Sequence, residues 1–526
     1  MVGYADYIVT NANIITLAAP HRPTSMAIMR DRILALGSRD EMELFRGPNT
    51  KIMDLEGKTV LPGLNDNHCH PVTYADNLLK VDLSSVTSQE ELLGKLKARA
   101  KDCAPGQWVL GYGYDEMRFP EKREPSLQQL DQAIPDHPLY VTRACLHAGF
   151  GNSKLFAQAG WSKDTPLPDG AVKDENGELT GRVNEGAKFA LDNLVPPSTP
   201  AEAAKALAQV CAQYNAFGVT SIADMGHGAD DPALFRLWGD VLAQGGLTLR
   251  TASYLMDPAY LPYSQAGLPF PFGNSLYRVA GRKIFADGAI GTGTAGVSQP
   301  SSSGSTGLFH HTQEELDDLV WEAHSKGIQI SIHAMGDEGI RMALRAYQKA
   351  QQRLPQRDIR HRIEHCSMAY PDILDALCAQ KVYPLFNSGL YWYFGQAHIN
   401  HYGKERAEGQ YPFRTALDRG LPVANGTDCP VTSPDPRPVL YAAAKRVTQA
   451  GAPFGEKENI RVEEALRTYT IHGAFLTHEE HEKGTLEPGK LADFIVVDRD
   501  PIAEGPEALL EMTVLRTVLG GTTVFG

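Results

Sequence analysis

The chain has 526 residues, of which 42% are hydrophobic and 21% charged, and its formal net charge is −13 at pH 7. This composition is typical of a globular protein, and the acidic balance argues against nucleic acid or an anionic membrane as the main partner, because both require a concentrated basic surface. The length exceeds that of one ordinary core and indicates several domains, or one large barrel with additional parts.

The N-terminal twenty residues lack the basic and apolar regions of a secretion signal, and no apolar run approaches the ~18 residues needed to span a bilayer. The seven cysteines are scattered without CxxC spacing, which is typical of reduced thiols. We therefore expect a cytoplasmic protein that acts on a small molecule, and the composition leaves a homo-oligomer open.

Both ends of the chain have the pattern of β-strands. Residues 1–60 alternate apolar and polar positions between turn signals, as in DYIVTNANIITL and SMAIMRDRILALG. The C-terminal runs ADFIVVDRD and VLRTVLGGTTVFG return to this pattern. Because neither end has enough strands for a core of its own, we predict that residues 1–60 and 476–526 share one β-sandwich.

The middle of the chain alternates strand-like runs with amphipathic helical stretches, which indicates parallel α/β architecture. Eight short apolar runs end in polar or glycine-rich clusters: TVLPGLNDNHCH, GVTSIADMG, LTLRTASYL, RVAGRKIFADGAI, GIQISIHAMGD, HRIEHCSM, KVYPLFNSG and LPVANGTDCP. Eight is the strand number of a (β/α)₈ TIM-like barrel, so we predict this fold over residues 61–475. The long gap after the first run predicts a subdomain inserted at about residues 75–215, with a hairpin at AVKDENGELTGRVNEG.

Five of the eight runs end in or near a residue that can bind a metal ion. These residues are His68, His70, Lys283, His333, His365 and Asp428. The carboxyl ends of barrel strands form the active face, so ligands that are far apart in sequence converge there. His68 and His70 are two positions apart and point to the same side of a strand, where both can bind one ion. A single histidine at a strand end is weak evidence for a metal site. The prediction rests on the occurrence of all six residues, in order, on the strand-like runs.

The same segments resemble a known family. PGLNDNHCH resembles the PGxxDxHxH strand of the amidohydrolase superfamily, and KGTLEPGKLADFIVVDRDP resembles its C-terminal β-sandwich segment. IFADGAIGT, SIHAMGD, HRIEHC and NGTDCPV resemble the YtcJ-like branch, which includes N-substituted formamide deformylases. The resemblance extends to YVTRACLHAGFGNS in the predicted insertion and covers nearly the whole chain.

The resemblance implies a centre of two divalent metal ions, for which zinc is the natural choice. His68, His70 and Asp428 would hold the more buried ion, and His333 with His365 the more exposed one. Lys283 would bridge both ions as a carboxylated lysine, although it could instead be a cation paired with Asp287 or another carboxylate.

The function implied is hydrolysis of a non-peptide C–N bond in an N-substituted formamide, acyl amide or carbamate, by attack of a hydroxide that bridges the ions. Catalytic roles fall to Asp428, which moves the proton, and to Lys283 and His333. The alternatives are a mononuclear deaminase or cyclic-amide hydrolase, and a non-catalytic binding protein stabilised by zinc.

Candidates for substrate binding are less well specified by the sequence. Asp115, Arg143 and His147 in the insertion could face the substrate, or the charged side chains could pair with each other. Asp287, near the end of the fourth run, is a further candidate. Tyr391, Trp392 and Phe394 follow the seventh run and could pack an aryl or alkyl group, or could cover a helix start. We interpret His227 and His398 as ordinary surface or loop histidines.

Overall fold

The computed structural model describes residues 4–18, 22–104, 106–143, 148–226 and 233–526. The chain divides into two compact units, of which the first comprises Met1–Thr73 with Leu207–Gly526 and the second comprises Tyr74–Ala206. Among the described helices, none is both long enough and apolar enough to cross a bilayer.

The first unit contains a β-sandwich built from both ends of the chain. One sheet has the strand order β4-β3-β1-β5, and the other has the order β2-β6-β22-β23-β24. Their bounds are Tyr7–Thr10 (β1), Asn13–Ile14 (β2), Ser25–Met29 (β3), Arg32–Gly37 (β4), Lys51–Asp54 (β5), Thr59–Pro62 (β6), Phe494–Val497 (β22), Val514–Leu519 (β23) and Thr522–Phe525 (β24). Helices α1 (Arg39–Glu43), α19 (Pro501–Glu504) and α20 (Pro506–Glu511) accompany them.

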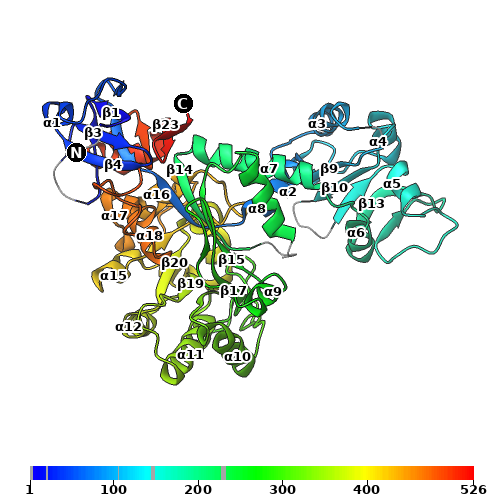
Figure 1. Cartoon of the computed structure of the whole chain (residues 1–526). Coiled ribbons are helices and arrows are strands. Elements are labelled where there is room, and N and C mark those ends of the chain that lie inside the picture. The colour runs from blue at the N-terminus through cyan, green and yellow to red at the C-terminus, as the bar shows by residue number, and fades with distance from the viewer. Residues whose placement is uncertain (1–3, 19–21, 105, 144–147, 227–232) are drawn as a thin grey trace. The chain divides into compact units, whose positions relative to one another are not determined.

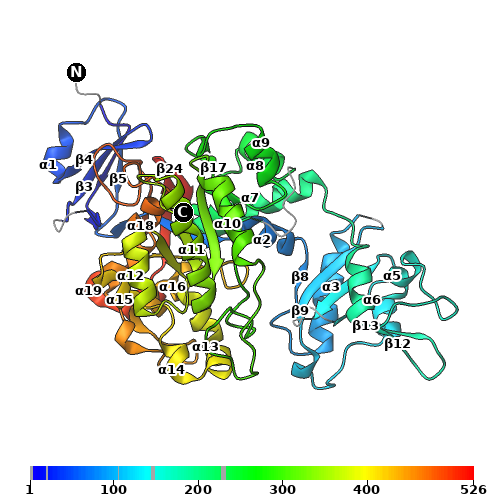
Figure 2. The same cartoon turned by 90° about the horizontal axis from the view of Figure 1, so that it is seen from below.

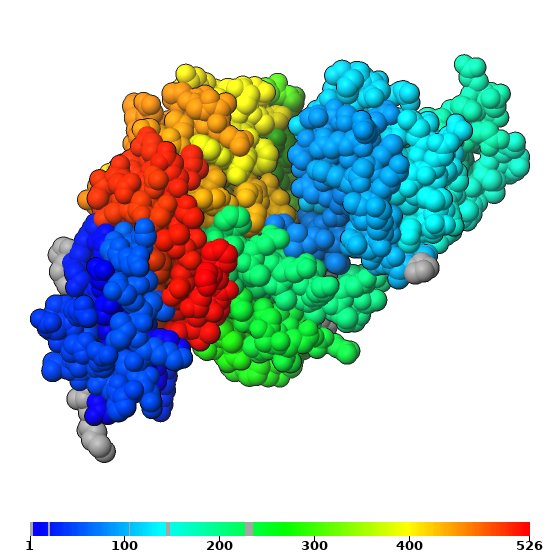
Figure 3. Space-filling view, turned by 90° about the horizontal axis from the view of Figure 1, so that it is seen from above, coloured from blue at the N-terminus to red at the C-terminus, as the bar shows by residue number. Residues whose placement is uncertain are grey.

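The two ends of the chain are joined by strand pairing and by a common core. Strand β22 runs antiparallel to β6, with Val496 opposite Val60. Val9 and Met26 from one sheet and Phe494 from the other belong to one buried apolar cluster. Figures 1 and 3 show the N-terminal segment in blue beside the C-terminal segment in red. The predicted sandwich made from both termini is therefore present.

The rest of the first unit is a barrel of parallel strands with the order β21-β20-β19-β18-β17-β15-β14-β7. These strands span Leu64–Cys69 (β7), Val219–Asp224 (β14), Arg250–Leu255 (β15), Tyr277–Phe285 (β17), Gln329–Ala334 (β18), Arg362–His365 (β19), Tyr383–Phe386 (β20) and Ala424–Asn425 (β21), and a short strand, Phe272–Gly273 (β16), pairs with β17. Each of the eight predicted runs contains one of the parallel strands, so the predicted TIM-like barrel is confirmed.

Backbone hydrogen bonds join the end of β7, the first strand of the barrel, to the segment that follows β21, the last strand. The Asp428 N–H donates to the His68 carbonyl at 2.7 Å, and the His70 N–H donates to the Cys429 carbonyl at 2.7 Å. The segments that carry the two histidines and the aspartate are thus held side by side by the closure of the barrel itself.

Helices lie outside the strands, as Figures 1 and 2 show for α10, α11 and α12. Helix α10 begins at a capping box in which Thr312 and Glu315 satisfy each other's backbone N–H groups, and it buries Leu316 and Val320. The helices of this part of the first unit are α8 (Ala233–Ala243), α9 (Tyr260–Gln265), α10 (Gln313–His324), α11 (Asp337–Arg353), α12 (Pro371–Gln380), α13 (Ser388–Tyr402), α14 (Lys404–Glu408), α15 (Phe413–Asp418), α16 (Pro436–Lys445), α17 (Val462–Thr468) and α18 (Ile471–Leu476). The chain passes from one unit to the other within α2 (Pro71–Leu78) and within α7 (Pro200–Ala216).

The second unit has its own sheet, with the order β12-β13-β11-β10-β9-β8. Its elements are β8 (Val81–Asp82), β9 (Val109–Tyr114), β10 (Leu139–Arg143), β11 (Ala148–Gly151), β12 (Ala171–Lys173), β13 (Leu179–Asn184), α3 (Gln89–Lys101), α4 (Leu127–Ala133), α5 (Ser153–Gln158) and α6 (Glu185–Asp192). The predicted hairpin is the antiparallel pair β12–β13. Buried clusters around Leu139 and around Tyr140 give this unit an apolar core of its own.

Because the two ends of the chain share one core, a change in the C-terminal strands should also reduce the protection of the N-terminal strands against amide hydrogen exchange. Phe494→Ala removes a fully buried ring that belongs to the core of both sheets, a change that typically costs ~3–5 kcal/mol. We expect faster amide hydrogen exchange in β1, β3 and β6 as well as in β22–β24, whereas the control Leu510→Ala, at a side chain 36% exposed, leaves exchange unchanged. Faster exchange confined to residues 494–525 would contradict the shared core.

Candidate metal centre

The six residues predicted from the strand ends lie around one cavity of about 430 Å³. His68 is on β7, Lys283 on β17 and His333 on β18, while His365 ends β19. His70 directly follows β7, and Asp428 follows β21. The barrel therefore brings together side chains separated by up to 360 positions in the sequence, at the carboxyl ends of its strands.

His68, His70 and Asp428 form a compact group whose possible ligand atoms all lie within 4.8 Å of one another. The Nε2 atoms of both histidines are 3.4 Å from the same oxygen, Asp428 Oδ1. On the far side of each ring, His68 Nδ1 is 2.6 Å from Glu364 Oε2, and His70 Nδ1 is 2.7 Å from the Gly226 carbonyl. Because both partners accept the proton on Nδ1, the Nε2 lone pairs point toward Asp428.

His333 and His365 are fixed in the same way but through different nitrogens. His365 Nδ1 donates to Asn387 Oδ1 at 2.8 Å, and Asn387 is oriented because its Nδ2 donates to the Gly426 carbonyl. His333 instead donates through Nε2 to the Gly288 carbonyl at 3.1 Å. The free lone pairs are therefore Nε2 of His365 and Nδ1 of His333. The ring centroids of the two residues lie 4.5 Å apart.

These imidazoles are held in the neutral form that a metal ligand requires. Burial keeps the pKa of His68 and of His365 well below the usual range of imidazole, and it lowers the pKa of His333 to about 3. The positive charge of Lys283 acts in the same direction on all three rings.

Lys283 is buried beside these rings, and its Nζ has no hydrogen-bond partner among the described residues. The Nζ lies 4.9 Å from the centroid of the Phe285 ring. Burial lowers the pKa of Lys283 to about 8, although Glu364 and Asp428 pull it back upward. Asp287 does not serve as its counter-ion, because the carboxylate of Asp287 accepts three backbone N–H groups.

The backbone is strained at two of the six residues. His365 has φ 65° and Asp428 has φ 61°, which is a backbone region that residues other than glycine rarely adopt. At His365 the strain has a geometric use, since strand alternation alone would send Glu364 and His365 to opposite sides. Both side chains instead contact His68, Glu364 through its carboxylate and His365 through its ring at 4.5 Å.

Sequence reasoning missed the residues that orient the histidines. Glu364 has no exposed surface, and its carboxylate accepts hydrogen bonds from Arg362 Nε and Ser331 Oγ at 2.8 Å each, in addition to its contact with His68. Its signal was present in HRIEHC, where an acidic residue occupies a buried strand position. Asn387 left no comparable signal, because an asparagine after a strand is common in turns.

Of the three aromatic residues expected at the substrate, Phe394 lines the cavity, whereas Tyr391 and Trp392 do not. Tyr391 is buried, donates its hydroxyl to the Ala442 carbonyl at 2.8 Å and stacks on Phe454. Trp392 packs edge-on against Tyr441. Both lie in α13, and the helical period turns Leu390, Phe394, Ala397 and His398 toward the cavity instead.

The charged candidates in the insertion are paired within the second unit. Arg143 donates to Asp115 Oδ1 and to Glu116 Oε2, both at 2.7 Å. His147 lies outside the described residues, as does His227. His398 was interpreted as an ordinary surface or loop histidine, but it is buried in α13 and lines the cavity. Its Nδ1 lies 2.8 Å from Gln410 Oε1.

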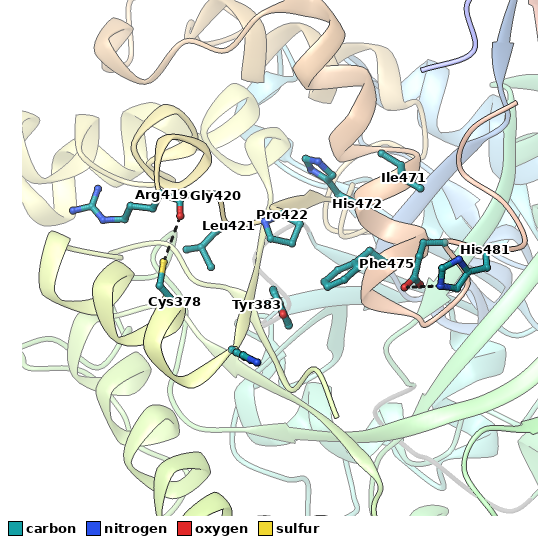
Figure 4. Close-up of a pocket in the computed structure, with 12 residues that line it drawn as sticks. Cys378, Tyr383, Arg419, Gly420, Leu421, Pro422, Ile471, His472, Phe475 and His481 are labelled. Carbon is teal, nitrogen blue, oxygen red and sulfur yellow. Dashed lines mark hydrogen bonds and ion pairs between the residues drawn. The ribbon is translucent and has the colours of Figure 1, made fainter. Parts of the chain in front are cut away.

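A second and larger cavity, of about 670 Å³, lies at the amino ends of β20 and β21. Figure 4 shows Arg419 and Leu421 on one side of it and His472, Ile471 and Phe475 on the other. It contains none of the six candidate ligands, and the amino end of a barrel ordinarily serves stability. We therefore place the chemistry at the smaller cavity.

The smaller cavity suits divalent metal ions, because polar atoms in its lining are buried without a hydrogen-bond partner in the described part of the chain. His68 Nε2 and Lys283 Nζ are buried without a hydrogen-bond partner in the described part of the chain, which is unusual for buried polar atoms. Each of the four histidines has one nitrogen committed to an acceptor and the other nitrogen available. Neutral imidazoles with a carboxylate are the donor set that zinc and related ions bind.

Comparison with known proteins shows the family of the chain. The model of the amidohydrolase family named Amidohydro_3 matches residues 51–525. The chain is 28% identical to YtcJ of Bacillus subtilis strain 168, covering 97% of this chain and 98% of that protein. It is also 28% identical to the N-substituted formamide deformylase of Arthrobacter pascens, covering 99% and 98% of the two chains.

Among solved structures, an uncharacterized metal-dependent hydrolase from Pyrococcus furiosus superimposes with a TM-score of 0.77 at 26% identity, covering 94% of this chain and 99% of the other. The family match extends over most of the chain, from the last strand of the first sandwich sheet to the C-terminal strand. The chain belongs to the amidohydrolase family.

Proposed function

We propose that this amidohydrolase cleaves an amide-type C–N bond of a small, uncharged organic molecule at a centre of two metal ions. The observation that carries the proposal is the arrangement of four imidazoles around Lys283 and Asp428, each with one nitrogen tied to an acceptor and the other available. The relationship to a formamide deformylase supports the reaction class.

His68, His70 and Asp428 would hold one ion, and His333 with His365 would hold the other. Zinc suits these donors, and Mn, Fe, Co or Ni also bind such sets. When bound, the ions would act as Lewis acids and lower the pKa of water enough to make it a nucleophile near neutral pH.

Asp428 would handle the proton of the reaction. Its Oδ1 lies 3.4 Å from both His68 Nε2 and His70 Nε2, and its side chain reaches the cavity. A carboxylate in this position accepts the proton that the attacking water loses and returns it to the nitrogen that leaves, which is a general-base and then a general-acid role.

Lys283 would be shared by the two ions as its carbamate. An ammonium group has no lone pair and repels a cation, whereas the neutral amine adds to CO₂, loses one proton and becomes an anionic oxygen ligand. Support comes from the position of Nζ, which is buried among histidines and has no hydrogen-bond partner in the described chain.

The apolar part of the cavity lining favours an apolar substituent on the substrate. Leu390, Phe394 and Val431 belong to it, and the charged residues among the described lining are Lys283 and Asp428, which belong to the metal centre. A carboxylate on the substrate would find no cationic partner in this lining. Neutral N-alkyl or N-aryl amides, formamides and carbamates fit this chemistry.

A centre with one ion is the second candidate. His68, His70 and Asp428 are the one group of three acidic, histidine or cysteine side chains in the described residues that is close enough to hold an ion without Lys283. This group favours a mononuclear deaminase or cyclic-amide hydrolase, and the number of ions bound per chain discriminates between the two candidates.

Replacement of Lys283 tests the shared ligand. Lys283→Ala should reduce both metal content and turnover, and short carboxylic acids should restore part of each by filling the space that the side chain leaves. Lys283→Arg should not respond, because its bulk stays in the site and it cannot form a carbamate. Elemental analysis that finds two ions bound to Lys283→Ala with wild-type affinity would refute the shared role.

Replacement of Asp428 tests the proton transfer. Asp428→Asn keeps an oxygen donor but cannot carry a proton, so turnover should fall ~10²–10⁴-fold, which is the usual contribution of general acid–base catalysis. Because Asp428 is also a proposed ligand, the comparison is made at saturating metal, where the ion content and the far-ultraviolet circular dichroism should match those of the wild type. Wild-type kcat in the fully loaded variant would eliminate the proposed proton role.

Turnover of a panel tests the substrate class. We expect hydrolysis of N-aryl and N-alkyl formamides, acetamides or carbamates, and little hydrolysis of analogues that carry a carboxylate. Phe394→Ala should raise KM for aryl substrates roughly 10- to 100-fold, because burying such a ring contributes about 1.5–3 kcal/mol. Tyr393→Ala, one position along α13 and outside the cavity lining, is the matched control. Preference for carboxylated substrates would contradict this assignment.

A further inference from the structure

Asp287 has an environment that substrate binding does not explain. The residue follows β17 and has no exposed surface. Its Oδ1 accepts the Met335 N–H at 2.9 Å, and its Oδ2 accepts the N–H groups of Gly296 and Gly336 at 2.8 Å each. Three backbone donors thus converge on one carboxylate, and among the described residues no lysine or arginine pairs with it.

These bonds tie together two segments that border the metal centre. Gly296 belongs to the loop between β17 and α10, whereas Met335 and Gly336 form the turn between β18 and α11. Addition of a Cβ to Gly336 would bring it within 2.0 Å of the Gly296 carbonyl, so the two segments pack backbone to backbone. Asp287 therefore fixes the start of the loop against the end of the strand that carries His333.

The start of this loop sets the orientation of His333. The residue after Asp287 is Gly288, whose carbonyl accepts the Nε2 proton of His333 at 3.1 Å. A carbonyl oxygen can only accept, so this contact leaves the proton on Nε2 and the lone pair on Nδ1. The Oδ1 of Asp287 itself lies 3.8 Å from His333 Nε2, on the same side of the ring.

We infer that Asp287 is a positioning residue, which holds the Gly288 carbonyl so that His333 presents Nδ1 to a metal ion. The inference rests on the proposed two-ion function, in which His333 binds the more exposed ion. Without the carboxylate, the three N–H groups lose their common acceptor, the loop start shifts, and the ring of His333 is no longer held in one orientation.

The chain offers a matched control in Asp337. This carboxylate is also buried, and it anchors the same loop further along, where it accepts the N–H of Ser298 at 3.0 Å and also pairs with Arg341. It has no hydrogen bond to Gly288 or His333 in the described structure. Loss of Asp337 therefore loosens the loop without removing the acceptor beside His333.

The test compares metal binding by Asp287→Asn and Asp337→Asn holoenzymes, measured as ions per chain and by competition with a chelator for Zn²⁺. In Asp287→Asn we expect one of the two ions to bind ~10–100-fold more weakly, which is the usual effect of removing an outer-shell partner, while the other ion is unaffected. Asp337→Asn should retain both affinities at a comparable change in Tm. Equal affinities in the wild type and Asp287→Asn would overturn the inference.

A double-mutant cycle separates positioning from general loosening of the fold. If Asp287 acts through His333, adding Asp287→Asn to His333→Ala should change the remaining Zn²⁺ affinity less than ~2-fold, because the two changes remove the same interaction. A further loss as large as in the wild-type background would show that the effect does not pass through His333, and would overturn the inference.

The crystal structure of the wild-type holoenzyme tests the same point without a variant. Coordination through Nδ1 of His333, with Nε2 on the Gly288 carbonyl, supports the inference even if Asp287→Asn fails to fold. Coordination through Nε2 overturns the inference and leaves the proposed function intact. A wild-type chain that holds one ion, with His333 unbound, overturns both.

Discussion

The candidate centre depends on a carboxylate that water does not reach. Glu364 lies inside the barrel with no exposed surface, and it joins Arg362, Ser331 and His68 in one hydrogen-bonded group. Removing one partner of such a buried pair typically costs ~3–5 kcal/mol, because the other charge is left uncompensated. The orientation of His68 is therefore coupled to the stability of the barrel core, and the histidine is fixed before any ion binds.

The other candidate histidines are oriented in the same way as His68. Each candidate histidine is held by an acceptor on the side away from the cavity, and these acceptors come from different strands and loops. Closure of the barrel between β7 and the segment after β21 adds Asp428. The positive φ of Asp428 is maintained by two hydrogen bonds, one from its own N–H to the His68 carbonyl and one from the Thr427 N–H to the Asp66 carboxylate. The strain at Asp428 and His365 is thus balanced by contacts that only the folded barrel provides.

Sequence patterns predicted those parts of the structure that depend on local chemistry. The eight strands were recognisable as short apolar runs with polar ends, and the ligand residues were recognisable because His68, Lys283, His333 and Asp428 each stand where a strand finishes. The shared sandwich followed from the lack of a core at either end. The orientation of α13 could not be predicted in the same way, since its mean pattern is apolar on most sides, so Tyr391 and Phe394 were equally plausible at the cavity. The role of Asp287 depends on backbone donors from Gly296 and Gly336, which a sequence does not bring together.

We propose that the six side chains build a site for two ions joined by a carboxylated lysine. A high-resolution crystal structure of the holoenzyme, with anomalous metal signal, tests it most directly. We expect two metal peaks ~3.5–4 Å apart, which is the spacing of paired catalytic ions, with density for a carbamate on Lys283 between them. A single peak beside an unmodified Lys283, or two peaks more than ~5 Å apart, would contradict it, because such a pair could not share one ligand.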